Sequence, residues 1–122
     1  MLDITGLINR IEQDGYQVTW HTDHPAGAWN PEQNLISIQH GMSDAATRSV
    51  LAHEYGHAYH RHPAGCHPAH EDKADRFAAR LLISAPEYAL AEAIYDSQPA
   101  LVAAELGVSL RILQAFRRLQ VQ

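Results

Sequence analysis

Residues 50–58 read Val50-Leu51-Ala52-His53-Glu54-Tyr55-Gly56-His57-Ala58. Apolar residues around two histidines four positions apart predict a helix that carries both imidazoles on one face, one turn apart. Such a pair can bind one metal ion, while Glu54 lies where its carboxylate reaches a water molecule rather than the ion. This His-Glu-x-x-His spacing is typical of zinc hydrolases, with His53 and His57 as metal ligands and Glu54 as the catalytic general base.

The boundaries of this helix follow from its flanking residues. Ser43 suits an N-cap and Asp44 suits the positive first turn, so the helix is expected to begin there. The helix is expected to end at about His60 or Arg61, because Pro63 does not allow it to continue. Residues 62–68 contain two prolines and a glycine and are expected to form a loop. Another helix, with a buried apolar stripe, is predicted from about residue 69.

A catalytic zinc site needs three protein ligands and an open position for water. Metzincins extend the motif with a glycine and a third histidine, but this chain has His60 and Pro63 at those positions, which excludes that class. Glu71 and Asp75 lie four residues apart on the next predicted helix and share a face. We predict that Glu71 is the third ligand. Asp75 is expected to accept a hydrogen bond from the outer ring nitrogen of a ligating histidine, which fixes its tautomer.

Other assignments of these residues stay open. Glu71 and Asp75 also suit a solvated helix face, with Glu71 near the positive helix N-terminus. Cys66 could bind zinc as a thiolate, but its loop position and the structural character of thiolate sites favour Glu71. His60 is too distant to share an ion with both motif histidines and is expected on the surface. The six histidines between residues 53 and 70 could equally form an exposed polar tract.

The remaining segments predict a small α+β domain. Alternating apolar runs indicate strands, and runs with helical spacing indicate helices. A zincin-like domain is expected, in which a short antiparallel sheet of two or three strands packs with about five helices and the motif lies on the central helix. Residues 1–122 are expected to form this single domain. The predicted helices are residues 3–13, 43–60, from 69, from 84, and 99–120 with a break at Gly107, and the predicted strands are residues 16–21, 28–29 and 35–39.

Two features of the substrate cleft allow alternatives. The strand at residues 35–39 is either an edge strand, to which a substrate could pair as an added strand, or an inner strand. The residue that stabilises the oxyanion has several candidates. These are Tyr55, Tyr59, His60, His62, His67 and His70.

Composition narrows the class of protein. The 122 residues carry a net charge of −5 with neutral histidines, so the chain lacks the excess of positive charge that is typical of nucleic-acid binders. No apolar run is long enough to span a bilayer, and the N-terminus has no signal-peptide pattern. Cys66 is the single cysteine and cannot form an internal disulfide. We therefore expect a cytoplasmic protein without membrane contact.

Two other functions compete with catalysis. The first is a zinc-containing module that binds a protein without cutting it, although a structural site has no need of a base such as Glu54. The second is DNA binding, because residues 101–118 resemble a helix-turn-helix with Arg111, Arg117 and Arg118 on the later helix. The acidic charge of the whole chain favours a simpler interpretation, in which these two helices close the domain.

The residues around the motif resemble the ImmA/IrrE family of metallopeptidases. The resemblance spans roughly residues 16–90 and is carried by residues 51–58 and by Glu71-Asp72-Lys73-Ala74-Asp75-Arg76-Phe77-Ala78-Ala79-Arg80-Leu81-Leu82-Ile83. It implies a gluzincin-like zinc fold and an endopeptidase that cleaves a regulatory protein, often the repressor of a phage or mobile element. On that pattern His53, His57 and Glu71 match the metal ligands, and Glu54 matches the catalytic base.

The chain departs from the family pattern in places outside the motif itself. Lys73 stands where many relatives have a second acidic residue, and Ile83-Ser84 stands where many have Met-Pro. The DNA-binding domain that precedes the protease-like part in some relatives has no counterpart in this sequence. The identity of a regulatory protein substrate is therefore an expectation from resemblance alone.

Overall fold

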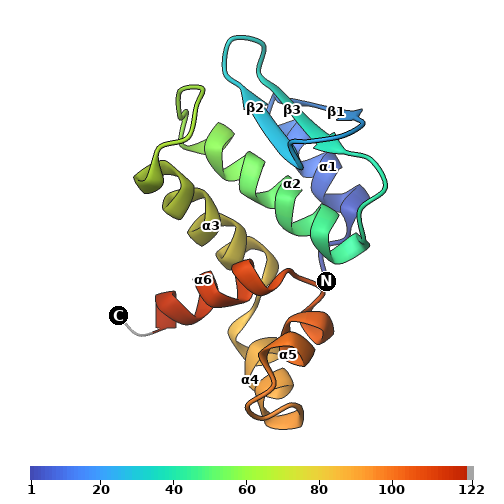
Figure 1. Ribbon diagram of the computed structural model, residues 1–122, viewed down its shortest axis with the longest axis vertical. Helices are drawn as coiled ribbons and strands as arrows, with labels where there is room; N and C mark the ends of the chain where they lie inside the picture. Colours follow the sequence, from blue (N-terminus) through green and yellow to red (C-terminus); the bar gives the residue numbers. More distant parts are fainter. Residues whose placement is uncertain (121–122) are drawn as a thin grey trace.

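A computed structural model describes residues 1–120, which form six helices and three strands in a small α+β fold (Figure 1). This confirms the predicted fold class of a small α+β domain with about five helices. The predicted domain reached residue 122, and its last two residues lie outside the described part. The elements are α1 (Ile4–Gln13), β1 (Gln17–His21), β2 (Gly27–Asn30), β3 (Leu35–Gln39), α2 (Asp44–Tyr59), α3 (Pro68–Leu82), α4 (Ala85–Ile94), α5 (Pro99–Leu106) and α6 (Leu110–Gln120).

The sheet is mixed, whereas the sequence suggested a purely antiparallel one. The strand order is β1-β3-β2, with β2 antiparallel to β3 and β1 parallel to it. The reason is that β3 inserts between the two earlier strands after the turn at residues 31–34. Alternation along a strand shows which face is buried but carries no information about the direction of its partner.

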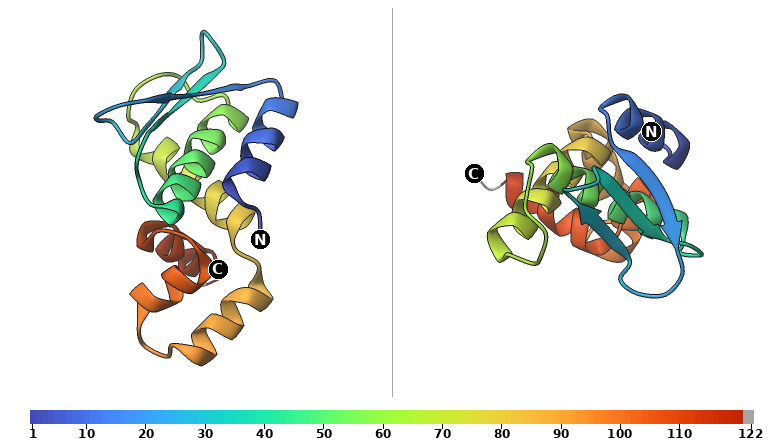
Figure 2. Two further views of the ribbon diagram at one scale, coloured as in Figure 1. Left: turned by 90° about the vertical axis from the view of Figure 1, so that its right-hand side faces the viewer. Right: turned by 90° about the horizontal axis from the view of Figure 1, so that it is seen from above.

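Strand β3 is the central strand, so the possibility that residues 35–39 form a sheet edge is wrong. Ile36 and Ile38 are fully buried, while the strands on either side are largely exposed. The apolar run of β3 therefore occupies the position with partners on both sides. Among the described residues β2 is an edge strand, and it lies along α2 (Figure 2).

Helix α2 lies between the sheet and α3, and its start is as predicted. The side chain of Ser43 accepts a hydrogen bond from the backbone N–H of Ala46, and Asp44 occupies the positive first turn. Helix α3 packs closely against α2 at Gly56, where an added Cβ would lie 3.0 Å from the backbone of Ala74. A glycine inside the motif thus lets the two helices approach, which brings the first two turns of α3 next to the motif histidines.

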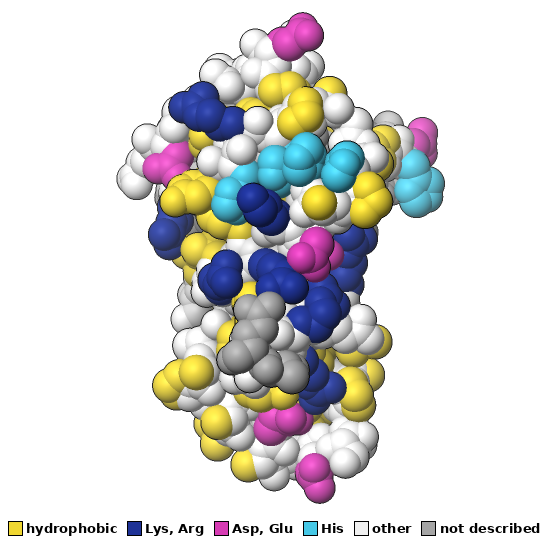
Figure 3. All heavy atoms as spheres, turned by 90° about the vertical axis from the view of Figure 1, so that its left-hand side faces the viewer, with side chains coloured by type: hydrophobic (Ala, Val, Ile, Leu, Met, Phe, Trp, Pro, Cys, Tyr) yellow, Lys and Arg dark blue, Asp and Glu magenta, His cyan; other side chains and the backbone are white. Residues whose placement is uncertain are grey.

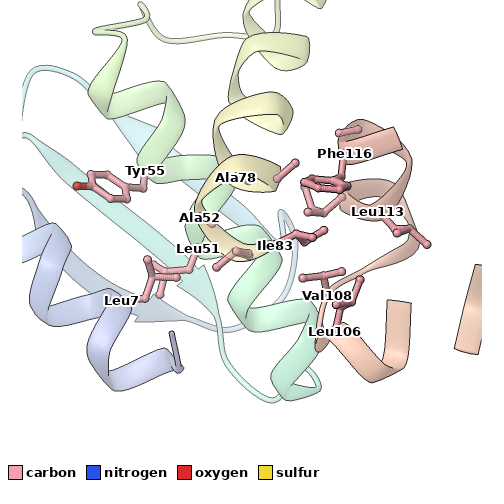
Figure 4. Packing of buried hydrophobic residues seen from close by; sticks show 14 of the residues in the cluster. Leu7, Leu51, Ala52, Tyr55, Ala78, Ile83, Leu106, Val108, Leu113 and Phe116 are labelled. Carbon is pink, nitrogen blue, oxygen red and sulfur yellow. The ribbon is translucent and has the colours of Figure 1, made fainter. Parts of the chain in front are cut away.

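Helices α4, α5 and α6 close the opposite end of the hydrophobic core (Figures 1 and 4). Helix α5 ends at Gly107, whose φ of 67° is the left-handed conformation that glycine adopts without strain. Val102 and Leu106 on one side of this turn, and Ile112 and Leu113 on the other, are buried. These residues belong to the same hydrophobic cluster as the core of α2 and α3, while the single domain over residues 1–122 stays a prediction.

No single helix among residues 1–120 is long and apolar enough to cross a bilayer. Helices α5 and α6 together have sufficient length and apolar character, but the pair is bent by 99°.

Candidate metal centre

Helices α2 and α3 bring three metal-ligating side chains together. Nε2 of His57 lies 3.1 Å from Nε2 of His53 and 2.6 Å from one carboxylate oxygen of Glu71, and the other carboxylate oxygen lies 3.3 Å from Nε2 of His53. Donors at about 2.0–2.1 Å from a tetrahedral ion lie roughly 3.3 Å apart. The three donors are thus spaced as one small divalent cation requires, and within the described residues they form the one such group.

The outer nitrogen of His53 has the carboxylate partner that the sequence suggested. Nδ1 of His53 lies 2.8 Å from Asp75, whose second oxygen accepts a hydrogen bond from Nε of Arg111 on α6 at 2.9 Å. Burial opposes the charged form of Asp75, but these two partners lower the pKa of its carboxyl. Burial also disfavours charge on His53, yet Asp75 and the carboxylates of Glu54 and Glu71 raise its pKa. The site therefore has a negative potential that suits a cation.

The outer nitrogen of His57 has a different partner. Its Nδ1 lies 2.9 Å from Nδ1 of His62, which is buried although it lies in the loop after α2. Burial, followed by the proximity of His70 and His57, lowers the pKa of His62 to about 4. Burial and the neighbouring His53 also lower the pKa of His57. Both rings of this pair are therefore neutral near pH 7, which leaves a ring nitrogen of His57 free to bind a metal.

Glu54 is buried beside the three donors but is not one of them. Its carboxylate lines a cavity of about 230 Å³ together with His57, Glu71 and the edge strand β2. Burial and, to a smaller extent, the charge of Glu71 raise the pKa of Glu54 to about 7, against the opposing effect of His53. A carboxyl group with such a pKa can both take and release a proton near neutral pH. The structure thus places Glu54 beside the donors, and its role as the general base stays a prediction.

Strand β2 approaches the site because it contains a glycine. A Cβ on Gly27 would lie 2.4 Å from Cγ1 of Val50 and 3.0 Å from the side chain of Glu54. Two residues along, Nε1 of Trp29 donates a hydrogen bond to the carbonyl of His62 at 2.9 Å. Both residues line the cavity. Their position shows that β2, rather than β3, is the strand beside the site.

The candidates for oxyanion stabilisation do not line this cavity. The hydroxyl of Tyr55 donates a hydrogen bond to Asp14 on the side of α2 that faces α1. Tyr59 and His60 are exposed and pack around Phe77. The surface position of His60 is as predicted. Next to the site, the buried ring of His62 stacks on His70 at the start of α3, and His70 in turn contacts His67 with its ring tilted by 37°. Figure 3 shows the resulting row of histidine side chains.

Cys66 is exposed and lines the cavity, but its thiol is outside the group of convergent donors. Sequence reasoning missed three other residues at the site. Gly27 lies outside the predicted strands, Arg111 was considered as a contact to DNA, and His62 was one of several candidates for oxyanion stabilisation. The contact of Gly27 with α2 and that of Arg111 with Asp75 join segments far apart in the chain, so local spacing contained no signal for them. His62 lies only five residues after His57, but it follows the end of α2 at Tyr59, so helical spacing does not place the two rings together.

Comparisons with known proteins give one match. The family model Peptidase_M78, described as the IrrE N-terminal-like domain, matches residues 12–116. No curated protein and no solved structure matches the chain. The matched region contains the motif helix, the three convergent donors and the helices that close the core. The chain therefore belongs to the Peptidase_M78 family of IrrE N-terminal-like metallopeptidases.

Proposed function

We propose that this protein is a zinc-dependent endopeptidase of the cytoplasm that cleaves a regulatory protein, such as the repressor of a phage or mobile element. The observation that carries the proposal is the convergence of His53, His57 and Glu71 beside the buried carboxylate of Glu54. Two imidazoles and a carboxylate suit zinc among the common divalent ions. The repressor as substrate and the cytoplasmic location rest on the sequence alone.

Each residue of the site has a role in this proposal. His53, His57 and Glu71 would hold the metal, and Asp75 keeps His53 in the tautomer whose Nε2 can bind it. The metal, when bound, would supply Lewis-acid activation of water and of the scissile carbonyl. Glu54 would accept the proton of the attacking water and later donate it to the leaving amine.

The substrate would bind as an additional strand on β2. Ala26 accepts a hydrogen bond from the backbone N–H of Gln39, so residues 26 and 28 direct their backbone groups toward β3. In an antiparallel pair the intervening residues, Gly27 and Trp29, then direct their N–H and C=O groups away from β3. A peptide paired with them would run along the cavity that Glu54, His57 and Glu71 line. This main-chain recognition gives affinity without demanding a particular sequence.

Glu54→Gln tests catalysis separately from metal binding. The variant keeps the three donors and removes the base, so we expect bound zinc near one ion per chain with turnover reduced by about 100- to 10,000-fold. The measurement is cleavage of a peptide mixture by the zinc-loaded protein, followed by mass spectrometry, with zinc counted by elemental analysis. His57→Ala is the matched control and should lose the zinc. Equal cleavage by Glu54→Gln and the wild type would exclude the proposed mechanism.

The two competing functions make different predictions in the same experiments. A binding module would hold zinc but cleave no peptide, and Glu54→Gln would change nothing. DNA binding is disfavoured because the three arginines of α6 form ion pairs with carboxylates of this chain. Arg111 pairs with Asp75, Arg117 with Glu92 and Arg118 with Asp72.

A further inference from the structure

His62 is placed unlike its neighbours in the loop between α2 and α3. Residues 63 to 69 are exposed, yet the exposed fraction of His62 is 5%. Its Nδ1 lies 2.9 Å from Nδ1 of His57 on the side of that ring opposite the convergent donors. A histidine buried in an otherwise exposed loop, in contact with a proposed metal ligand, needs a physical explanation.

The hydrogen bond between the two rings determines where the protons are. A bond between two Nδ1 atoms contains one proton, and a neutral imidazole has one N–H. Nε2 of His57 faces Glu71 and His53, so the proton of His57 belongs on Nδ1 when that ring acts as a ligand. Nδ1 of His62 is then the acceptor, and its own proton is on Nε2.

We propose that His62 is a positioning residue that holds His57 in the tautomer and orientation required for metal binding. The proposal rests on the proposed role of His57 as a ligand. It assigns to His62 the function that Asp75 has for His53, so that each ligating imidazole has its own partner on the outer nitrogen. Such partners typically contribute 10- to 100-fold to metal affinity.

An imidazole suits this position better than a carboxylate does. Glu54, Glu71 and Asp75 already place three carboxyl groups around two histidines in a largely buried site. A fourth carboxylate would add a buried negative charge that a single divalent cation could not offset. Neutral His62 accepts the hydrogen bond without changing the charge of the site.

Contacts from three elements hold His62 in place. Its backbone N–H donates to the carbonyl of His57 on α2 at 3.0 Å. Its backbone carbonyl accepts the hydrogen bond from Nε1 of Trp29 on β2, at 2.9 Å. Its ring stacks on His70 of α3 with centroids 4.1 Å apart and planes 15° apart. These contacts fix the ring of His62 against Nδ1 of His57.

The test compares His62→Ala with His62→Asn. Asparagine places an amide oxygen near the position of Nδ1 and can still accept the hydrogen bond from His57, whereas alanine cannot. We expect zinc affinity, measured by competition with a chromophoric chelator, to fall 10- to 100-fold in His62→Ala and to recover at least partly in His62→Asn. His70→Phe is the matched control: it removes another histidine from the row but keeps an aromatic ring against His62, and its zinc affinity should equal that of the wild type.

A second measurement reports the hydrogen bond rather than the affinity. In the zinc-loaded protein, ¹⁵N–¹H spectra of the imidazole rings detect the Nδ1 proton of His57 and its rate of exchange with solvent. We expect this proton to exchange slowly in the wild type, the His62→Asn variant and the His70→Phe control, and rapidly in His62→Ala. Unchanged zinc affinity and unchanged exchange of this proton in His62→Ala would overturn the proposal, as would an equal loss of affinity in His70→Phe. A wild type that binds zinc but cleaves no peptide would overturn only the proposed peptidase function.

Discussion

At Gly27 the backbone of β2 lies directly against α2, in a space that no side chain can share. An added Cβ would lie 2.4 Å from Cγ1 of Val50, and a β-branched residue in a helix has little rotamer freedom with which to move away. The same Cβ would lie 3.0 Å from Cγ and from a carboxylate oxygen of Glu54. Because Gly27 has no side chain, β2 can approach α2 closely enough for Glu54 and the edge strand to line one cavity.

Gly27→Ala should therefore impair catalysis while leaving the donors in place. A shift of about 1 Å in β2 or in Glu54 is expected to reduce turnover of a peptide mixture by roughly 100-fold. The zinc content measured by elemental analysis should stay near that of the wild type. Thr19→Ile is the control, because it adds bulk to an exposed position of β1, outside the cavity. Full activity in Gly27→Ala would show that β2 is not in contact with the reacting peptide.

Among the elements, α2 determines the arrangement of the others. One side of it contacts the sheet and another contacts α3, and near its start Arg48 reaches the ends of two further segments. Nε of Arg48 donates to the carbonyl of Leu2 at 2.8 Å, and its Nη1 donates to the carbonyls of Leu106 and Gly107 at the end of α5. A buried cation at the C-terminus of α5 is favourable because the helix dipole is negative there. The helix that carries the motif is therefore tied to both the N-terminus and the C-terminal helices.

Arg48→Met should weaken this junction without changing the site. Methionine keeps much of the volume but leaves three carbonyls without their charged donor, so we expect a loss of about 2 kcal/mol in the free energy of unfolding. Urea denaturation followed by circular dichroism measures this loss. Arg10→Met is the control, since Arg10 is exposed on α1 and should change stability by less than about 0.5 kcal/mol. Equal stability of the two variants would show that Arg48 does not hold the C-terminal helices.

For the whole molecule, the metal would act as a link between α2 and α3. Two of its three donors come from α2 and one comes from α3, while Asp75 of α3 connects onward to Arg111 of α6. The side chain of Arg111 is 62% exposed, so this last ion pair is expected to contribute little stability by itself. Metal binding should instead stabilise the fold by linkage, because the unfolded chain does not hold the three donors together.

Removal of the metal should lower the melting temperature. Free zinc at 100 times its dissociation constant stabilises a protein by about 2.7 kcal/mol, which for a chain of this length corresponds to a shift of about 10 °C. Differential scanning calorimetry with zinc and with a chelator measures the shift. Glu54→Gln should keep the full response, whereas Glu71→Gln, which weakens the third ligand, should lose most of it. A response that Glu71→Gln retains in full would place the ion elsewhere.

Interactions between residues close in the sequence were sufficient to predict the helices and the geometry of the motif. The caps of α2, the apolar stripe of α3 and the break at Gly107 depend on residues within a few positions of one another, so the helices were predictable. The spacing of His53 and His57 and their relation to Glu54 follow from the helical repeat alone. The structure places Glu71 of α3 beside the two histidines, because a short loop between two helices leaves few ways to pack them, and its role as a ligand stays a prediction.

Tertiary structure alone decided which strand borders the site and which residues support the ligands. The direction of β1, the edge position of β2 and the contact of Arg111 with Asp75 depend on segments separated by many residues, and such pairings leave no periodic pattern in a single sequence. His62 combines a local and a distant contact. Its backbone N–H donates to the carbonyl of His57, five positions earlier, at 3.0 Å, and its own carbonyl accepts a hydrogen bond from Nε1 of Trp29, 33 positions earlier. The first contact forms at the end of α2, whereas the second exists only because β2 packs beside the loop.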